Sequence, residues 1–260
     1  MTRTRTAAAR SAAVPRLRPV RRQSLSDAVF EQLRDQIVRG ERPPGSALPA
    51  ERALCEALGV NRGAVREALR RLEQARLVAV RQGGISRVLD YRESAGLELL
   101  GALLVDAEGR FDPHVVRGIL EMRSALGPDV ARLAALRGGA ACADALEAPL
   151  AALAAAQGDL AALQDAASAF WARLVEGSDN VAYRLAYNAL NETYERCRPL
   201  LARALAPELG DLAAYQAIAD AVRRGEGAEA EALARALLRR GEAGVLAALE
   251  RARVLEEVRS

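Results

Sequence analysis

The sequence is short of the residues that most enzymes use for chemistry. Its 260 residues contain no lysine, one histidine and three cysteines, and aromatic residues make up 3% of the chain. All 37 basic residues are arginine, and we attribute much of this usage to coding bias rather than to function. A single histidine leaves little for acid–base catalysis, and no Ser-His-Asp, Cys-His or phosphate-loop pattern is present. We therefore expect a protein that is not an enzyme.

Cysteine spacing and hydropathy exclude two further classes. Cys55, Cys142 and Cys197 lie far apart, with no C-x-x-C pair, which argues against a disulfide framework or a zinc ribbon. No apolar run approaches the roughly 20 residues of a membrane-spanning helix, and no apolar signal core follows the arginine-rich start. We expect a cytoplasmic protein with no membrane partner.

Charge is distributed unevenly along the chain. Residues 1–22 hold seven arginines and no acid, residues 23–90 hold 11 arginines against nine acids, and the remainder holds 19 against 25. This distribution of charge is expected if only the N-terminal part of the molecule contacts phosphate groups. Residues 1–22 also have few large apolar side chains, which predicts a disordered basic arm.

Residues 23–90 read as three helices and a hairpin. Apolar positions three and four residues apart predict a first helix that ends near Gly40, and Asn61 is a good N-cap for a third helix. A glycine turn between two short apolar runs predicts the hairpin. These elements make a winged helix-turn-helix: helices over 25–40, over 50–58 and from 62 onward, and strands over 77–81 and 85–89.

Two linked motifs in this unit carry a family resemblance. Residues 43–52 read P-P-G-x-x-L-P-A-E-R, and residues 60–72 read V-x-R-x-x-V-R-E-A-L-x-x-L. Together they closely resemble the N-terminal domain of the GntR family of bacterial transcription factors. The resemblance implies a helix-turn-helix that lays its third helix in the major groove of double-stranded DNA.

The resemblance also implies which residues meet DNA. Arginine suits this role because its planar fork matches the two acceptors of guanine, whereas small or short residues allow close backbone approach. Gln82 departs from the histidine that some members carry at the wing tip, and a solvated helix face is the alternative for the arginines. The implied contacts are Arg52, Arg62 and Arg66 to phosphates and bases, Asn61 and Gly63 at the helix start, and Gln82 and Gly83 in the minor groove.

The rest of the chain lacks strand signals and is rich in alanine and leucine. Glycine, proline and aspartate breaks predict helices over 93–107, 113–137, 141–156, 159–177, 180–205, 209–224 and 227–250. We expect a mainly α protein whose C-terminal part is an all-α antiparallel bundle of six or seven helices. The predicted divisions are an arm (1–22), a DNA-binding domain (23–90), a linker helix region (91–112), an effector-binding and dimerisation domain (113–252) and a tail (253–260).

The order of domains resembles the FadR subfamily of this family, with Glu121-Met122-Arg123 opening a long helix. Many members hold a divalent metal through an aspartate and three histidines. This chain has only His114, at a helix start, and places Trp171 and Tyr215 in segments where those members have histidines. We expect the metal site to be lost, with no cofactor, and His114 to be a surface or capping residue.

Loss of the metal directs attention to the metal-free branch, which is typified by the fatty-acid regulator FadR and binds long-chain acyl-CoA. Residues 91–100 and 178–183 resemble its linker and one of its turns. The resemblance implies an apolar pocket with large or polar residues on otherwise Ala/Leu helices, although core packing is an equal alternative for each aromatic. The candidates are Arg123, Trp171, Arg184, Tyr187, Asn188, Tyr194 and Tyr215.

These observations predict a homodimeric repressor that binds a palindromic operator and releases it when an effector occupies the bundle. The effector is an acyl-CoA under the FadR resemblance. Two alternatives stay open: a regulator that responds to a small carboxylate metabolite, and a constitutive DNA-binding dimer without effector.

Overall fold

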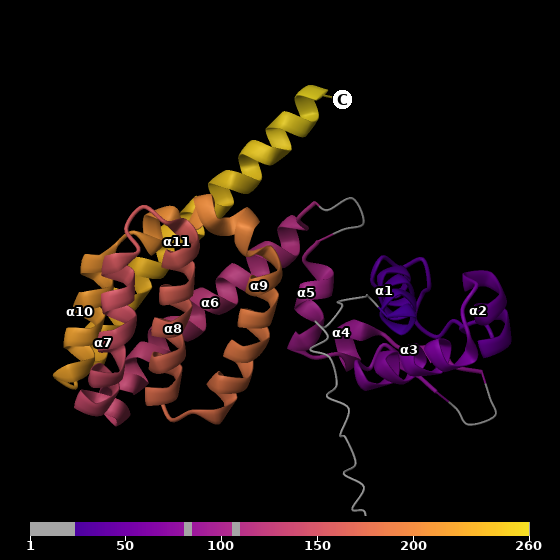
Figure 1. Ribbon diagram of the computed structural model, residues 1–260, viewed down its shortest axis with the longest axis horizontal. Helices are drawn as coiled ribbons and strands as arrows, with labels where there is room; N and C mark the ends of the chain where they lie inside the picture. The colour runs from indigo at the N-terminus through magenta and orange to yellow at the C-terminus, as the bar shows by residue number, and fades with distance from the viewer. Residues whose placement is uncertain (1–23, 81–84, 106–109, 260) are drawn as a thin grey trace, which may run out of the picture.

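The computed structural model describes residues 24–80, 85–105 and 110–259, with side chains as far as Val254. The predicted basic arm therefore lies outside the described residues. Two bodies make up the described chain, one formed by the first three helices and the other by the last six, with short linker helices between them (Figure 1). Each body has its own buried apolar cluster.

The first body is the predicted winged helix-turn-helix. It contains α1 (Leu25–Val38), α2 (Glu51–Leu58) and α3 (Arg62–Gln74), followed by β1 (Val78–Ala79) and β2 (Arg87–Val88). Ser24 caps α1, because its hydroxyl accepts from the Asp27 N–H while the Asp27 carboxylate accepts from the Ser24 N–H. Gly59 ends α2 in the left-handed region at φ +64°, which glycine adopts without strain.

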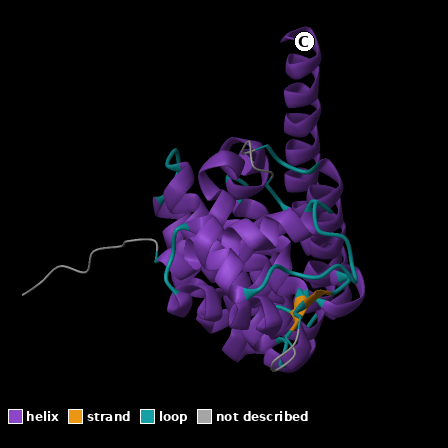
Figure 2. Ribbon diagram, turned by 90° about the vertical axis from the view of Figure 1, so that its right-hand side faces the viewer, coloured by secondary structure: helices purple, strands orange, loops and turns teal. Residues whose placement is uncertain are grey.

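The wing is a small antiparallel sheet, with Val78 opposite Val88 (Figure 2). The proline-rich turn before α2 runs along this sheet. The Gly45 N–H donates to the Val88 carbonyl at 2.8 Å, and the Leu48 N–H donates to the Ser86 carbonyl at 2.8 Å. The turn therefore attaches the hairpin to the helices.

The linker differs from the predicted helix over 93–107. The chain forms α4 (Tyr91–Ser94), a 3₁₀ turn η1 (Leu97–Leu99) and α5 (Leu100–Leu103). Extended backbone at Ala95 and Gly96 separates α4 from η1, and α5 follows η1 directly. The prediction of one continuous helix was wrong because local caps compete with it. The Ser94 hydroxyl donates to the Asp90 carbonyl, and the Gly96 N–H donates to the Glu98 carboxylate at 3.1 Å.

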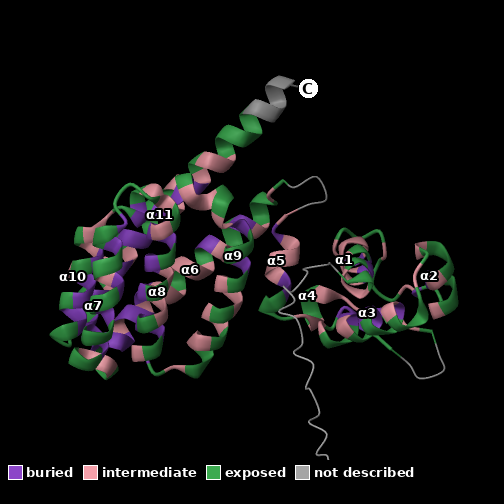
Figure 3. Ribbon diagram, in the orientation of Figure 1, coloured by how far each residue is buried: buried purple, intermediate pink, exposed green. Residues whose placement is uncertain are grey.

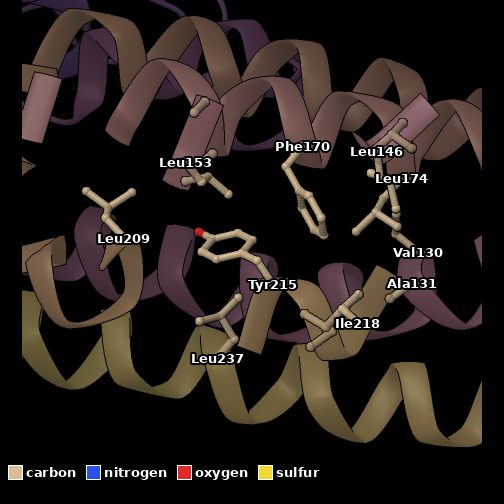
Figure 4. Close-up of a cluster of buried hydrophobic side chains, with 14 of the residues drawn as sticks. Val130, Ala131, Leu146, Leu153, Phe170, Leu174, Leu209, Tyr215, Ile218 and Leu237 are labelled. Carbon is tan, nitrogen blue, oxygen red and sulfur yellow. The ribbon is translucent and has the colours of Figure 1, made fainter. Parts of the chain in front are cut away.

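The second body confirms the expected helical bundle. Its first helix passes through a π-helical turn (Ala134–Gly138) into the second, and Gly139, at φ +50°, follows that turn. Phe170 and Tyr215 meet edge to face at its centre, with ring centroids 4.9 Å apart (Figure 4). The six helices of the described bundle are α6 (Pro113–Leu133), α7 (Gly139–Ala155), α8 (Leu160–Gly177), α9 (Val181–Leu209), α10 (Leu212–Arg223) and α11 (Gly227–Arg259).

Two bundle helices are longer than predicted. α9 continues to Leu209 through Pro199 and Pro207, because side chains on its inner face stay buried in the bundle and packing outweighs the lost backbone bonds. α11 continues to Arg259 rather than ending near residue 250, so residues 253–259 of the predicted tail are helical, and the last turns of α11 project from the bundle (Figures 1 and 3). In the described part of the chain, no helix is long and apolar enough to cross a membrane.

Candidate DNA interface and bundle cavity

The first candidate site is the outer face of α3. Its inner face carries Val65, Ala68 and Leu72, which are fully buried against the other helices. Asn61 caps its first turn, since the side-chain Oδ1 accepts from the Ala64 N–H at 2.9 Å. Gly63 is exposed in that turn. The helix start is therefore fixed by a cap and open to solvent.

Arginine side chains stand around this helix start. Arg66 is 72% exposed and lies 3.7 Å from the Glu51 carboxylate, and Arg52 on α2 is 84% exposed and pairs with Glu56 at 2.9 Å. Exposed ion pairs of this kind contribute little to stability, so these guanidinium groups are available to other anions. Arg62 is also exposed. Gln82 and Gly83, predicted for the wing tip, lie outside the described residues.

The second candidate site is a cavity of about 180 Å³ inside the bundle. Side chains from α6, α8, α9 and α11 line it, together with Leu104 and Phe111 from the segment that precedes α6. The lining is mostly aliphatic and aromatic, which is typical of sites for apolar ligands. Its apolar residues include Val116, Ile119, Leu120, Val130, Leu190, Leu201, Leu205 and Leu238.

An ion pair between Arg123, whose side chain is 29% exposed, and the buried Glu208 marks the polar part of this cavity. Arg123 Nη1 lies 2.9 Å from Glu208 Oε2, and Arg123 Nη2 contacts the other carboxylate oxygen. Glu208 is 1% exposed. Burial by itself lowers the pKa of Arg123, but the charge and hydrogen bonds of Glu208 outweigh burial and raise it. Arg123 therefore stays charged, and the Glu208 carboxylate is its ion-pair partner.

Two further polar atoms near the cavity have no hydrogen-bond partner of normal geometry. They are the indole Nε1 of Trp171 and the hydroxyl of Tyr215. The two groups are close enough for the indole to lower the pKa of Tyr215 slightly, but burial dominates and holds that pKa well above its ordinary value. Burial likewise raises the pKa of Tyr194 to about 12. The phenols are therefore neutral, and the indole N–H lies near the Tyr215 hydroxyl without a hydrogen bond of normal geometry.

The structure brings only part of the predicted effector set together. Arg123, Trp171 and Tyr194 line the cavity, as does Tyr187. Arg184 instead donates to the Ala172 carbonyl at 3.0 Å, tying α9 to α8.

The remaining predicted residues do not line the cavity. Asn188 is exposed on α9, and Tyr215 is fully buried in the bundle core (Figure 4). Glu208 was not among the predicted residues, because it lies 85 residues from Arg123 and no local pattern signals that pairing.

The histidine behaves as a surface residue. His114 is exposed, and its backbone N–H donates to Asp112, the N-cap of α6, at 2.8 Å. Among the described residues, no three histidine, cysteine or acidic side chains come together in a group able to hold a metal ion. Trp171 faces the cavity, and Tyr215 packs in the core beside it.

A winged helix-turn-helix with an exposed basic helix start, joined to a helical bundle with an internal cavity, defines a DNA-binding regulator with a ligand domain. Comparisons with known proteins agree. Residues 25–88 match the family described as bacterial regulatory proteins, gntR family, and residues 118–240 match the FCD domain. The chain belongs to the gntR family, and the FadR-type resemblance is confirmed.

Individual relatives support this assignment over most of the chain. The HTH-type transcriptional regulator Mce2R of Mycobacterium tuberculosis is 41% identical over 233 residues, which cover 90% of this chain and 96% of that one. An uncharacterised regulator of the same species, Rv0494, is 36% identical over 195 residues, 70% of this chain and 78% of that one. The matching families and these relatives are transcriptional regulators, which confirms the expectation that the chain is not an enzyme.

Two further likenesses are narrower. The fatty acid metabolism regulator protein of Vibrio cholerae is 37% identical over 101 residues, which cover 38% of this chain and 36% of that one. A solved structure described as Lar, which controls expression of the Listeria monocytogenes agr system, has a TM-score of 0.52 at 16% identity, and the match covers 86% of this chain and 98% of that one. The structural likeness shows the fold. The family matches and the relatives that cover most of the chain make the protein a DNA-binding transcriptional regulator with an effector-binding FCD domain.

Proposed function

We propose that the protein is a cytoplasmic repressor, that it binds a palindromic operator as a homodimer, and that an apolar effector in the bundle cavity lowers its affinity for DNA. The observation that carries this proposal is the capped start of α3, where Arg62, Gly63 and Arg66 are exposed beside Arg52. The functional units are residues 23–90 and 113–252, joined by 91–112.

The geometry of α3 suits major-groove recognition. A recognition helix reads bases with residues near its N-terminus, and arginine binds guanine through two hydrogen bonds. Arg62 and Arg66 lie one turn apart, so both can reach the same groove. One chain offers one such helix, and two chains related by a two-fold axis reach half-sites about 34 Å apart. This supports a dimer on a palindrome.

The cavity supports an effector with an apolar part. An acyl-CoA would place its acyl chain among the leucine, valine and isoleucine side chains. Its phosphates would lie outside, because Arg123 is the one basic residue among the described lining residues and Glu208 already pairs with it. A small carboxylate metabolite is the alternative effector.

The linker supplies a physical connection between the two sites. Leu99 is buried in the core of the first body, whereas Leu104, five residues later, is buried in the bundle core and lines the cavity. Between them, Gly101 lies against the Arg196 side chain of α9, and a Cβ there would stand 3.3 Å from it. A ligand that displaces Leu104 would therefore move the segment that carries the DNA-binding body.

The DNA-binding part is tested with duplex DNA selected in vitro from a random pool. Arg66→Ala should weaken binding about 10- to 100-fold in fluorescence anisotropy, as expected for loss of one bidentate base contact. Arg173→Ala removes the same charge from an exposed position on α8 and should leave affinity unchanged. Equal loss in both variants would mean that overall charge, rather than the α3 face, determines binding.

Effector control is tested on the same complex with dodecanoyl-CoA, together with sedimentation of the free protein. We expect a dimer, and an operator affinity that falls by about 5- to 150-fold when the ligand is present. Unchanged affinity with dodecanoyl-CoA would reject the acyl-CoA assignment. A monomeric protein that still binds DNA would reject the palindrome.

A further inference from the structure

The charges inside the bundle cavity restrict what can enter it. Arg123 and Glu208 are the two charged residues among the described lining residues, and they bind each other through both guanidinium nitrogens and both carboxylate oxygens. The remaining polar lining side chains are uncharged amides and hydroxyls and the Trp171 indole. The cavity therefore contains no uncompensated charge.

Neighbouring arginines do not line the cavity. Arg198 lies near Tyr194 but pairs with Asp165 at 2.7 Å and with Glu195 at 3.2 Å. Arg184 does not line the cavity, and its Nη2 donates to a backbone carbonyl. An anion in the cavity would have to displace Glu208 from Arg123. Otherwise it would lie beside the ion pair with no positive charge to compensate it.

The packing of α9 against α11 holds the Glu208 carboxylate in place. A Cβ on Gly241 would overlap that carboxylate, and a Cβ on Gly244 would collide with the Ala204 carbonyl. The two glycines of α11 therefore allow α9 to approach closely at Glu208. A displaced Glu208 would be a buried, unpaired charge, which is costly.

An uncharged group meets no such obstacle. The lining is mostly aliphatic and aromatic, and apart from Arg123 and Glu208 its polar side chains are neutral. An alkyl chain, or the carbonyl group of an ester, thioester or amide, carries no charge that competes with Glu208 for Arg123. Such a group could fill the cavity without disturbing the ion pair.

We infer that the group entering this cavity is an uncharged alkyl or acyl group, and that Glu208 is the residue that excludes carboxylates. This inference rests on the proposed role of the cavity as the effector site. Glu208 supplies, from within the protein, the carboxylate that a free acid would otherwise bring to Arg123.

The test compares two six-carbon ligands, 1-hexanol and hexanoate at pH 8. Their size is matched to the cavity, because an engineered apolar cavity of about 150 Å³ binds benzene. Trp171 is the one tryptophan in the chain, so its fluorescence reports occupancy directly. With the full-length protein we expect saturable quenching by 1-hexanol, and binding of hexanoate at least about tenfold weaker.

Glu208→Gln keeps the shape of the side chain but leaves Arg123 uncompensated. We expect hexanoate affinity to rise at least about tenfold in this variant, whereas Glu250→Gln, an exposed change on α11, should bind like the unaltered protein. The double change Arg123→Met with Glu208→Leu removes the pair without leaving a charge, and should bind 1-hexanol and still reject hexanoate.

Equal or tighter hexanoate binding by the unaltered protein would overturn the inference, as would quenching by neither ligand or a folded Glu208→Gln protein that gains no hexanoate affinity. If Glu208→Gln does not fold, the unaltered protein and the double variant still decide the question. DNA binding is measured separately by anisotropy, so failure of this inference is distinguishable from failure of the proposed DNA-binding function.

Discussion

The two bodies of the molecule present their candidate sites in opposite ways. The first body has its site on the surface, within one helix and the turn before it, where Arg62 and Arg66 are exposed. The second has its site in the interior, where Arg123 and Glu208 come from two helices and are 85 residues apart in the sequence. A surface site formed by residues close together in the chain appears in the sequence as a compact motif. The residues of an interior site are scattered along the sequence.

This difference follows from what each site binds. DNA is large and presents repeating phosphates, so the protein needs only a rigid convex element that carries several charges. A small ligand must be surrounded, so its site draws on several helices and on the space between them. The same chain therefore combines a motif that predicts function with a domain whose function depends on tertiary contacts.

The separation of the two bodies can be tested by matched core substitutions. Leu72 and Leu146 are each fully buried, one in each body. Replacing either with alanine should cost about 2–5 kcal/mol in the unfolding of its own body. We expect Leu72→Ala to lower the first transition in scanning calorimetry and to weaken DNA binding, and Leu146→Ala to lower the transition reported by Trp171 fluorescence. If either substitution shifted both transitions together, the two bodies would unfold as one cooperative unit.

For the first body, the sequence predicted the helices and the hairpin that carry the candidate site. The start of the third helix at Asn61 depends on neighbours a few residues away, and the structure has the predicted cap there. The contact of the Gly45 turn with the wing was not predicted, because it joins segments more than 40 residues apart.

For the second body, helix number was predictable and the cavity was not. The spacing of apolar residues indicates helices, but it does not say which polar side chains face each other inside. Arg123 and Trp171 were selected as unusual residues on Ala/Leu helices, and Asn188 was selected for the same reason, yet Asn188 is exposed. In the sequence, Glu208 resembles any other charged residue near a helix end. Only the packing of α9 against α6 and α11 places it opposite Arg123.

Alkaline pH should weaken the bundle selectively. Burial raises the pKa of Tyr187 and of Tyr194 to about 12, and that of Tyr215 well above its ordinary value. An unfolded tyrosine has a pKa of about 10, so between pH 10 and 12 the unfolded chain loses these protons before the folded one. The stabilisation is thus complete below pH 10 and is lost as pH rises toward 12, on the order of 2 kcal/mol for Tyr187.

The measurement is urea unfolding followed by Trp171 fluorescence at pH 8 and at pH 11, with phenolate absorbance as a second probe. Tyr187→Phe removes one titrating group and also the 2.8 Å hydrogen bond from its hydroxyl to the Ser168 carbonyl. The variant should be less stable at pH 8 but should lose less stability between the two pH values. An unchanged pH slope would show that Tyr187 ionises normally in the folded state.

The smallest effect concerns the cap of the recognition helix. Asn61→Ala removes the acceptor for the Ala64 N–H and should cost about 1 kcal/mol in the unfolding of the first body. Asn188→Ala, at an exposed position within α9, is the matched control and should be neutral. Calorimetry measures both.

Asn61→Ser separates the cap from a contact with DNA. Serine caps helices about as well as asparagine, so this variant should recover the stability lost in Asn61→Ala. If it also recovers the affinity for the selected duplex, Asn61 acts on DNA only by fixing the start of α3. If stability returns while affinity does not, the asparagine side chain itself meets DNA, and the surface site of the first body includes its own helix cap.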